Sequence, residues 1–291
     1  MLPWSTWMAV LRAALSGWWA DRAMSLAAAI SFFTVFSLAP MLLVAIAVAG
    51  VVFGHEAAQG AIVAELGGML GERAAETIEA LIASAAKVQP GIGGTALGVV
   101  TFLVLVTGAV IELQDDLNFI WKVPAPERYG FMDFIQSRFL SFALLLGLGF
   151  LLLVSLVVDA ALSALSSWLE TSFSGAAFVV GLANSVVSLA IATVLFGMIF
   201  KLLPDVELTW RDVAVGALVT GVFFTAGKVL IGWYLGTSQI ASSYGAAASL
   251  VTILLWIYYS SLILLFGAEF TKAYTERLGS HSGAAKHELS R

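Results

Sequence analysis

No charged residue occurs between Lys228 and Glu269, and this run constrains the fold more than any other feature of the sequence. A helix needs about 20 consecutive apolar residues to cross the hydrocarbon core of a membrane. The run is long enough for two such crossings, and polar residues at 237–239 and 242–243 divide it. It therefore predicts two membrane-spanning helices, of which the first begins before Lys228.

The composition agrees with a membrane protein. Of the 291 residues, 60% are hydrophobic and 11% are charged, whereas a soluble domain has about 45–50% apolar and about 25% charged residues. The formal net charge of −5 has the wrong sign for a surface that binds nucleic acid. These values exclude an ordinary soluble enzyme, a disordered chain and a nucleic-acid partner.

Four further uncharged stretches predict helices of the same kind. We expect an all-α, polytopic membrane protein with six transmembrane helices, an N-terminal interfacial helix and an external helical segment between the first two spans. The membrane domain is expected at 23–275, between an amphipathic segment at 1–22 and a disordered tail at 276–291. The predicted spans are 27–53, 92–112, 139–160, 176–200, 213–236 and 245–269.

Lys and Arg residues are concentrated on one side of the predicted spans. Cytoplasmic loops carry an excess of these residues, and an even number of spans places both termini on the same side. We therefore expect both termini in the cytoplasm. Eleven of the 14 basic residues lie on this side: Arg12, Arg22, Lys122, Arg128, Arg138, Lys201, Arg211, Lys272, Arg277, Lys286 and Arg291.

The N-terminal segment shows helical periodicity. Trp4, Met8, Leu11, Leu15 and Trp18 recur at the spacing of one helix face. Trp is enriched at headgroup depth, so the pattern predicts a helix that lies on the membrane. We favour an anchor that stiffens the first span over a gate.

The external segment between the first two spans also has a helical pattern. Glu72, Glu76 and Glu79 form an acidic stripe on one face of it. The stripe could be a cation-attracting vestibule or a cap over a cavity. A charge stripe is more often a solvated face, and we favour that interpretation.

A first candidate site consists of polar groups within the outer halves of the spans. Lys228 lies about 12 Å inside the outer end of the fifth span, at 1.5 Å per residue, and Asn184 lies at a similar depth in the fourth. Asp159 is the nearby carboxylate, at the outer end of the third span. Ionisable groups at this depth suggest an ion- or headgroup-binding site. The open alternative is that Lys228 snorkels to the interface or joins two helices through Asp159.

Carboxylates also gather at the cytoplasmic ends of the spans. Glu112 and Glu269 are the last residues of the second and sixth spans, and two aspartates follow Glu112 at 115–116. These groups could form an inner ion site or a proton relay. Because cations are abundant on this side, we favour ion pairs with Arg138 and Lys201.

The sequence contains no recognised catalytic or metal-binding motif. It has no Cys and only three His, which excludes disulfides and thiolate sites and leaves little for a His-based metal site. It has no Walker sequence, no GxSxG nucleophile elbow and no HExxH. We expect no cofactor, no metal and no enzymatic activity.

Several stretches, in order and at the right spacing, resemble the BrkB/YihY family of bacterial inner-membrane proteins. Residues 28–40 (AAISFFTVFSLAP) resemble the opening signature of this family, and 111–121 (IELQDDLNFIW) resemble its second hallmark. A third hallmark surrounds the last span. It comprises Tyr244, Gly245, 254–259 (LLWIYY) and 266–270 (FGAEF), and Pro204, 210–212 (WRD) and Gly216 also agree with the family.

The resemblance implies six helices with cytoplasmic termini in a bacterial inner membrane. It also implies candidate functional residues, although no role comes with them. The family has a virulence label and a ribonuclease BN label, but this acidic chain lacks the acid–base pair and basic surface that an RNase needs, so we discount ribonuclease activity. The motif positions are Glu112, Asn118, Trp121, Tyr244, Gly245 and Glu269.

Two function classes follow from these patterns. We expect a transporter or a lipid- or envelope-handling protein, whose partners are membrane lipids and an unknown small or lipidic solute. The kink expected at Pro40 and the polar groups in both leaflets suit this class. The alternative is a non-catalytic structural or accessory protein of an envelope complex. A homo-oligomer stays open, although small-residue pairs such as Ala217 and Gly221 more often pack helices within one chain.

Overall fold

The computed structural model describes residues 4–70, 72–86, 108–124, 176–237 and 247–280. Within these ranges the chain forms helices joined by turns, and it contains no strand. The all-α prediction is therefore confirmed. The helices are α1 (Trp4–Ala20), α2 (Ala23–Phe53), α3 (His55–Leu70), α4 (Glu72–Ala86), an unlabelled helix at 108–120, α7 (Ala176–Leu202), α8 (Trp210–Thr237) and α10 (Ala248–Arg277).

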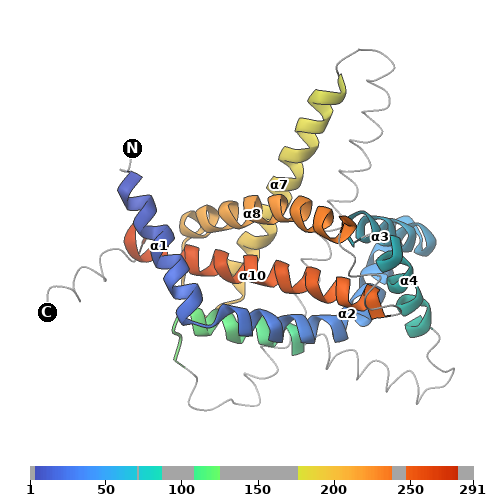
Figure 1. The fold of residues 1–291 in the computed structure, drawn as a ribbon, viewed down its shortest axis with the longest axis horizontal. Coiled ribbons are helices and arrows are strands. Elements are labelled where there is room, and N and C mark those ends of the chain that lie inside the picture. Colours follow the sequence, from blue (N-terminus) through green and yellow to red (C-terminus); the bar gives the residue numbers. More distant parts are fainter. Residues whose placement is uncertain (1–3, 71, 87–107, 125–175, 238–246, 281–291) are drawn as a thin grey trace, which may run out of the picture.

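Helix α10 occupies the centre of the described part of the fold (Figure 1). Its 30 residues make it about 45 Å long, and it packs against α1, α2, α4 and α8. α1 lies at one end of α10, and α3 and α4 lie at the other (Figure 1). We call the first the basic end, because it holds Arg12, Arg22, Lys122, Lys201, Arg211, Lys272 and Arg277.

A glycine–threonine seam joins α8 to α10. A Cβ atom at Gly216 would collide with Thr271, and a Cβ at Gly267 would collide with Thr220. Each threonine hydroxyl donates to the carbonyl four residues earlier on its own helix, at 2.7 Å. The two helices therefore approach closely with their polar side chains satisfied internally.

The adjoining face of α8 packs against α7. A Cβ at Gly197 would lie 3.7 Å from that of Ala217, and a Cβ at Gly221 would lie 3.0 Å from the Thr193 hydroxyl. The pair Ala217 and Gly221 thus packs helices within one chain, as predicted. The N-terminal part of α7 leads away from α8 (Figure 1).

Helices α3 and α4 form the helical segment that the sequence predicted after the first span. α4 buries Ile78 and Ile82 in a core that also contains Ile46 of α2 and Trp256 of α10. Glu76 and Glu79 lie on the exposed face of α4. Their position agrees with the solvated-face interpretation of the acidic stripe.

α1 forms where the periodicity predicted it, but the face that packs on the protein is a different one. Val10 and Ala14 are fully buried against Phe270 and Ala273 of α10. Trp4 and Leu15, which belong to the predicted apolar stripe, are 78% and 51% exposed. Small side chains let α1 approach α10 closely, and the large aromatic residues are left on the outer face, where a membrane interface would suit them.

Two described helices are long and apolar enough to cross a membrane: residues 181–202 of α7, and α10. Up to three crossings result if α1 and the start of α2, which meet at 65°, count as one bent span. Large apolar side chains such as Phe36, Val186 and Leu230 are exposed, as expected of surfaces in lipid. The predicted count of six is not confirmed, since 139–160 and most of 92–112 lie outside the described residues. Pro40 lies within α2, which continues to Phe53.

Candidate functional site

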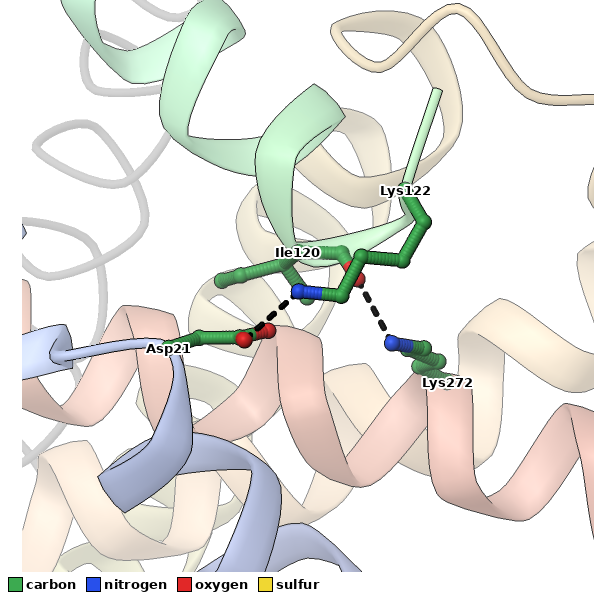
Figure 2. Close-up of polar contacts among 4 residues, drawn as sticks. All are labelled: Asp21, Ile120, Lys122 and Lys272. Atoms are coloured by element: carbon green, nitrogen blue, oxygen red, sulfur yellow. Dashed lines mark hydrogen bonds and ion pairs between the residues drawn. The ribbon is translucent and has the colours of Figure 1, made fainter. Parts of the chain in front are cut away.

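Charged and polar side chains from three segments meet at the basic end (Figure 2). The α1–α2 turn supplies Asp21, the end of the 108–124 segment supplies Lys122, and α10 supplies Glu269 and Lys272. We call these four side chains the α1–α10 cluster. The cluster joins parts of the chain that are more than 100 residues apart in sequence.

Asp21 and Lys122 form an ion pair of 2.6 Å. Each is placed by a turn in the left-handed region, with φ of 57° at Arg22 and 56° at Lys122. The second turn caps the 108–120 helix, because Val123 N–H donates to the Asn118 carbonyl at 2.9 Å. Glycine is the usual residue at such a position, and the lysine found there instead places its ammonium group on Asp21.

Lys272 bonds to the same segment from α10. Its Nζ donates to the Ile120 carbonyl at 2.7 Å, as Figure 2 shows. That carbonyl lies in the last turn of the 108–120 helix, where backbone carbonyls lack partners within the helix. Lys272 therefore fastens the end of this helix to α10.

Glu269 is the buried carboxyl group of the cluster, with 3% exposure. Its Oε1 is buried without a hydrogen-bond partner. The carboxyl group lies directly against Gly17 of α1, so closely that a Cβ at that position would collide with it. Gly17 thus makes room for an ionisable group between two packed helices.

A second polar contact joins the 108–120 helix to the α7–α8 turn. Asn118 donates to Asp205 Oδ2 and its Oδ1 accepts from Asp205 N–H, both at 2.8 Å. Gln114 adds longer bonds of 3.4 Å to the same carboxylate. Asn118, a motif residue, therefore positions the turn. Trp121, another motif residue, packs against the main apolar core.

Asp116 lies in the same motif and is 5% exposed, and its Oδ2 has no hydrogen-bond partner. Burial, followed by the charges of Glu112 and Asp115, raises the pKa of Asp116 from 3.8 to about 7. Such a group is protonated in a large share of molecules near neutral pH. It belongs to a segment that follows the predicted second span.

The predicted ion pair of the inner carboxylates with Lys201 is not seen within the described residues. Lys201 donates instead to the Leu208 carbonyl at 2.6 Å, within the α7–α8 turn. Arg138 lies outside the described residues, as do Tyr244 and Gly245. Within the described ranges, no group of three or more His, Cys, Asp or Glu residues could hold a metal ion.

The outer candidate site stays a prediction. Lys228 is half-buried on α8. Asp159 lies outside the described residues, and of Asn184 only the helical backbone in α7 is described. None of the pairs that the sequence suggested there is therefore tested.

The sequence reasoning missed Asp21, Lys122, Lys272 and Asp205 as site residues. A weak signal for the first was available, because Asp21 is the last acidic residue before a long uncharged run. A weak sequence signal for Lys122 was its position directly after the motif at 111–121. Neither signal identifies the partner, because each contact joins distant segments.

A family model described as Virulence factor BrkB matches residues 14–290 of the chain. A UPF0761 membrane protein of Pseudomonas paraeruginosa is 30% identical over 255 residues, which make up 85% of this chain and 58% of that protein. One from Mannheimia succiniciproducens is 44% identical over 77 residues, covering 26% of this chain and 27% of that protein. No solved structure matches.

The Pseudomonas relatives are longer, so that this chain spans less than two thirds of their length. The family model nevertheless covers nearly the whole chain, including the α1–α10 cluster and the Asn118 contact. Together with the apolar helices α7 and α10, these matches establish what kind of protein this is. The chain belongs to the BrkB family of membrane proteins.

Proposed function

We propose that this chain is a transporter or a lipid-handling protein of a bacterial inner membrane, with its basic end in the cytoplasm. The observation that supports this most directly is Glu269, a carboxyl group buried in the central helix α10. An ionisable group in such a helix is costly and commonly marks the pathway of an ion or a substrate. The partners would be membrane lipids and a small or lipidic solute.

Lys228 supports the same proposal from the opposite half of the bundle. It is half-buried on α8, whereas Leu230, two residues further on, is 63% exposed. The two residues therefore differ in their surroundings. In a transporter, Lys228 would line a route that contains water, and Leu230 would contact lipid.

The second candidate is a structural or accessory protein of an envelope complex. The glycine–threonine seam favours it, because close packing with satisfied hydroxyl groups leaves no room for water between α8 and α10. A helix bundle of this kind would bind partner proteins on its outer surface and would not open a pathway between its helices.

Single-cysteine labelling distinguishes the two candidates, and the chain has no native cysteine to interfere. Lys228→Cys and Glu112→Cys are treated with a membrane-impermeant thiol reagent in intact cells and in inverted vesicles. Transport predicts labelling at both positions, and Leu230→Cys, the matched control in lipid, stays unlabelled. If the Lys228→Cys and Glu112→Cys variants react no faster than Leu230→Cys from either side, the transport proposal fails.

The orientation is tested in the same preparation. Glu207 lies exposed in the α7–α8 turn at the basic end, and Glu76 lies exposed on α4 at the other end. We expect Glu207→Cys to react in inverted vesicles and Glu76→Cys to react in intact cells. The reverse pattern would contradict a cytoplasmic basic end.

A further inference from the structure

Helix α1 has three sides that differ in their surroundings. One side packs on the protein, where Val10 and Ala14 lie against α10 and against Val215 and Val219 of α8. At 3.6 residues per turn, the opposite side carries an exposed apolar stripe with a polar strip beside it. These two strips together form the outer face of α1, and their residues indicate what covers them.

The apolar stripe consists of Trp4, Met8, Leu15 and Trp19. Met8 is half-buried, whereas Trp4 and Trp19 are 78% and 72% exposed. A continuous exposed stripe of large apolar side chains marks a contact with a membrane or with another protein. Which of the two applies depends on the residues that border the stripe and on the surface that it continues.

The polar strip contains a basic residue. Arg12 is exposed, and on the helix surface it lies between Ser5, Ser16 and the apolar stripe. It is the one charged residue in the sequence of α1. Its aliphatic stem can follow the apolar stripe while the guanidinium group reaches a more polar layer. Trp and Leu on one side with Arg on the other is typical of a helix that lies in the headgroup layer of a membrane.

The apolar stripe also continues into the lipid-facing surface of α2. Exposed apolar side chains recur along α2 at Met24, Phe32 and Phe36. Arg22 is exposed between Trp19 and Met24, in the turn where the two helices meet at 65° (Figure 1). A bilayer that covers α2 therefore has its headgroup layer near Arg22. Because α1 leaves α2 at a steep angle, it runs along this layer.

The exposed charge of this surface is positive. Arg12, Asp21 and Arg22 are the charged residues in the stretch from α1 to the end of α2. Asp21 is buried and forms an ion pair of 2.6 Å with Lys122. Two exposed guanidinium groups remain, and guanidinium groups bind phosphate through paired hydrogen bonds. This charge is complementary to a headgroup that is anionic overall.

We propose that the outer face of α1, together with Arg22, binds anionic phospholipids. Trp4, Leu15 and Trp19 insert at the boundary between headgroups and acyl chains, and the two arginines bind the phosphates. The proposal rests on the membrane location that the family shows and not on transport. A failure of the labelling experiment described for the transport proposal therefore leaves this one standing.

Fluorescence quenching on the purified full chain in lipid nanodiscs tests the proposal. The chain has no native cysteine, so Leu15→Cys carries a single bimane label beside the apolar stripe. Val186→Cys is the matched control, because Val186 is exposed in a stretch of α7 without charged residues. The nanodiscs contain equal amounts of phosphatidylcholine and phosphatidylglycerol, of which one or the other is brominated at the same acyl position. The ratio of the two quenching values then reports lipid preference and not the depth of the label.

We expect phosphatidylglycerol to quench the Leu15→Cys label at least about twofold more strongly, because each arginine near an anionic surface favours it about fivefold. At Val186→Cys we expect equal quenching by the two lipids. Combining Arg12→Gln with Arg22→Gln should bring the ratio at Leu15→Cys close to one. Salt at about 1 M, which screens charges beyond about 3 Å, should have the same effect without any substitution in the binding surface.

Three results would overturn the proposal. A Leu15→Cys label that neither lipid quenches would place α1 in water or under a protein partner, such as a second copy of this chain. Equal quenching by the two lipids would make α1 an apolar anchor without a preference for anionic headgroups. A preference that survives both the arginine substitutions and high salt would have a cause other than Arg12 and Arg22.

Discussion

Helix α10 makes two close contacts through glycine, one with α8 and one with α1, and the two differ in chemistry. In the seam with α8, each glycine faces a threonine whose hydroxyl is bonded within its own helix. In the contact with α1, Gly17 faces the carboxyl group of Glu269, one oxygen of which has no partner. Glycine serves close packing in the first contact and makes room for a titratable group in the second.

The difference bears on how firmly each helix is held. A satisfied, closely packed interface is rigid. A buried polar atom without a partner costs about 1–3 kcal/mol. The contact with α1 is therefore the weaker of the two. We expect α8 to stay on α10 under conditions that release α1.

The largest predicted effect is at the seam. Gly216→Ala would place a Cβ against Thr271, whose own Cβ and Cα would lie at 2.8 and 3.2 Å. Because backbone must then move, we expect a loss of about 1–3 kcal/mol in the free energy of unfolding, measured by denaturation in detergent.

Gly60→Ala is the matched control for the seam, because a Cβ at Gly60 on α3 would meet nothing within 4 Å. Alanine is the better helix former, so this variant should gain up to about 1 kcal/mol. A Gly216→Ala variant as stable as Gly60→Ala would refute close packing at the seam.

A smaller effect is predicted at the contact with α1. Gly17→Ala displaces the carboxyl end of Glu269, which can rotate away, so we expect a loss of about 1 kcal/mol. Glu269→Ala removes the obstructing group, and the double variant should recover at least about 0.5 kcal/mol of coupling energy in a double-mutant cycle. Strict additivity of the two changes would show that Gly17 does not make room for Glu269.

The sequence predicted the long helices well, because a run without charges leaves few alternatives in a membrane. α7, α8 and α10 lie at the expected places. α10 continues to Arg277, eight residues past its predicted end at Glu269, and this extension brings Lys272 into the cluster. The hydrophobic pattern could not identify the buried face of α1, because such a pattern assigns the largest apolar residues, such as Trp, to the buried face. Close contact with α10 instead favours small residues such as Ala14.

The candidate site was predicted only in part, and for a physical reason. Glu269 and Asn118 were identified as candidate residues because they lie in motifs that resemble those of a known family. Their surroundings depend on contacts between distant segments, such as Lys272 with the Ile120 carbonyl across 152 positions. One sequence without an alignment contains no record of such contacts. Among the described residues, Lys201 forms no ion pair with the inner carboxylates, because it has a local backbone acceptor. The pairing with Arg138 stays a prediction, because Arg138 lies outside the described residues.

The smallest predicted effect concerns Lys122, whose side chain is 54% exposed. Its left-handed backbone costs an L-residue about 1–2 kcal/mol relative to glycine, and an exposed ion pair contributes about 0.2–1 kcal/mol. Lys122→Ala loses the pair and keeps the strain, whereas Lys122→Gly loses both. We therefore expect the glycine variant to unfold within about 1 kcal/mol of the wild type, and the alanine variant to be less stable than the glycine variant by about 1 kcal/mol. If both variants lose more than about 2 kcal/mol, the Asp21–Lys122 pair holds α1 as firmly as the seam holds α8, and the contrast between the two contacts of α10 disappears.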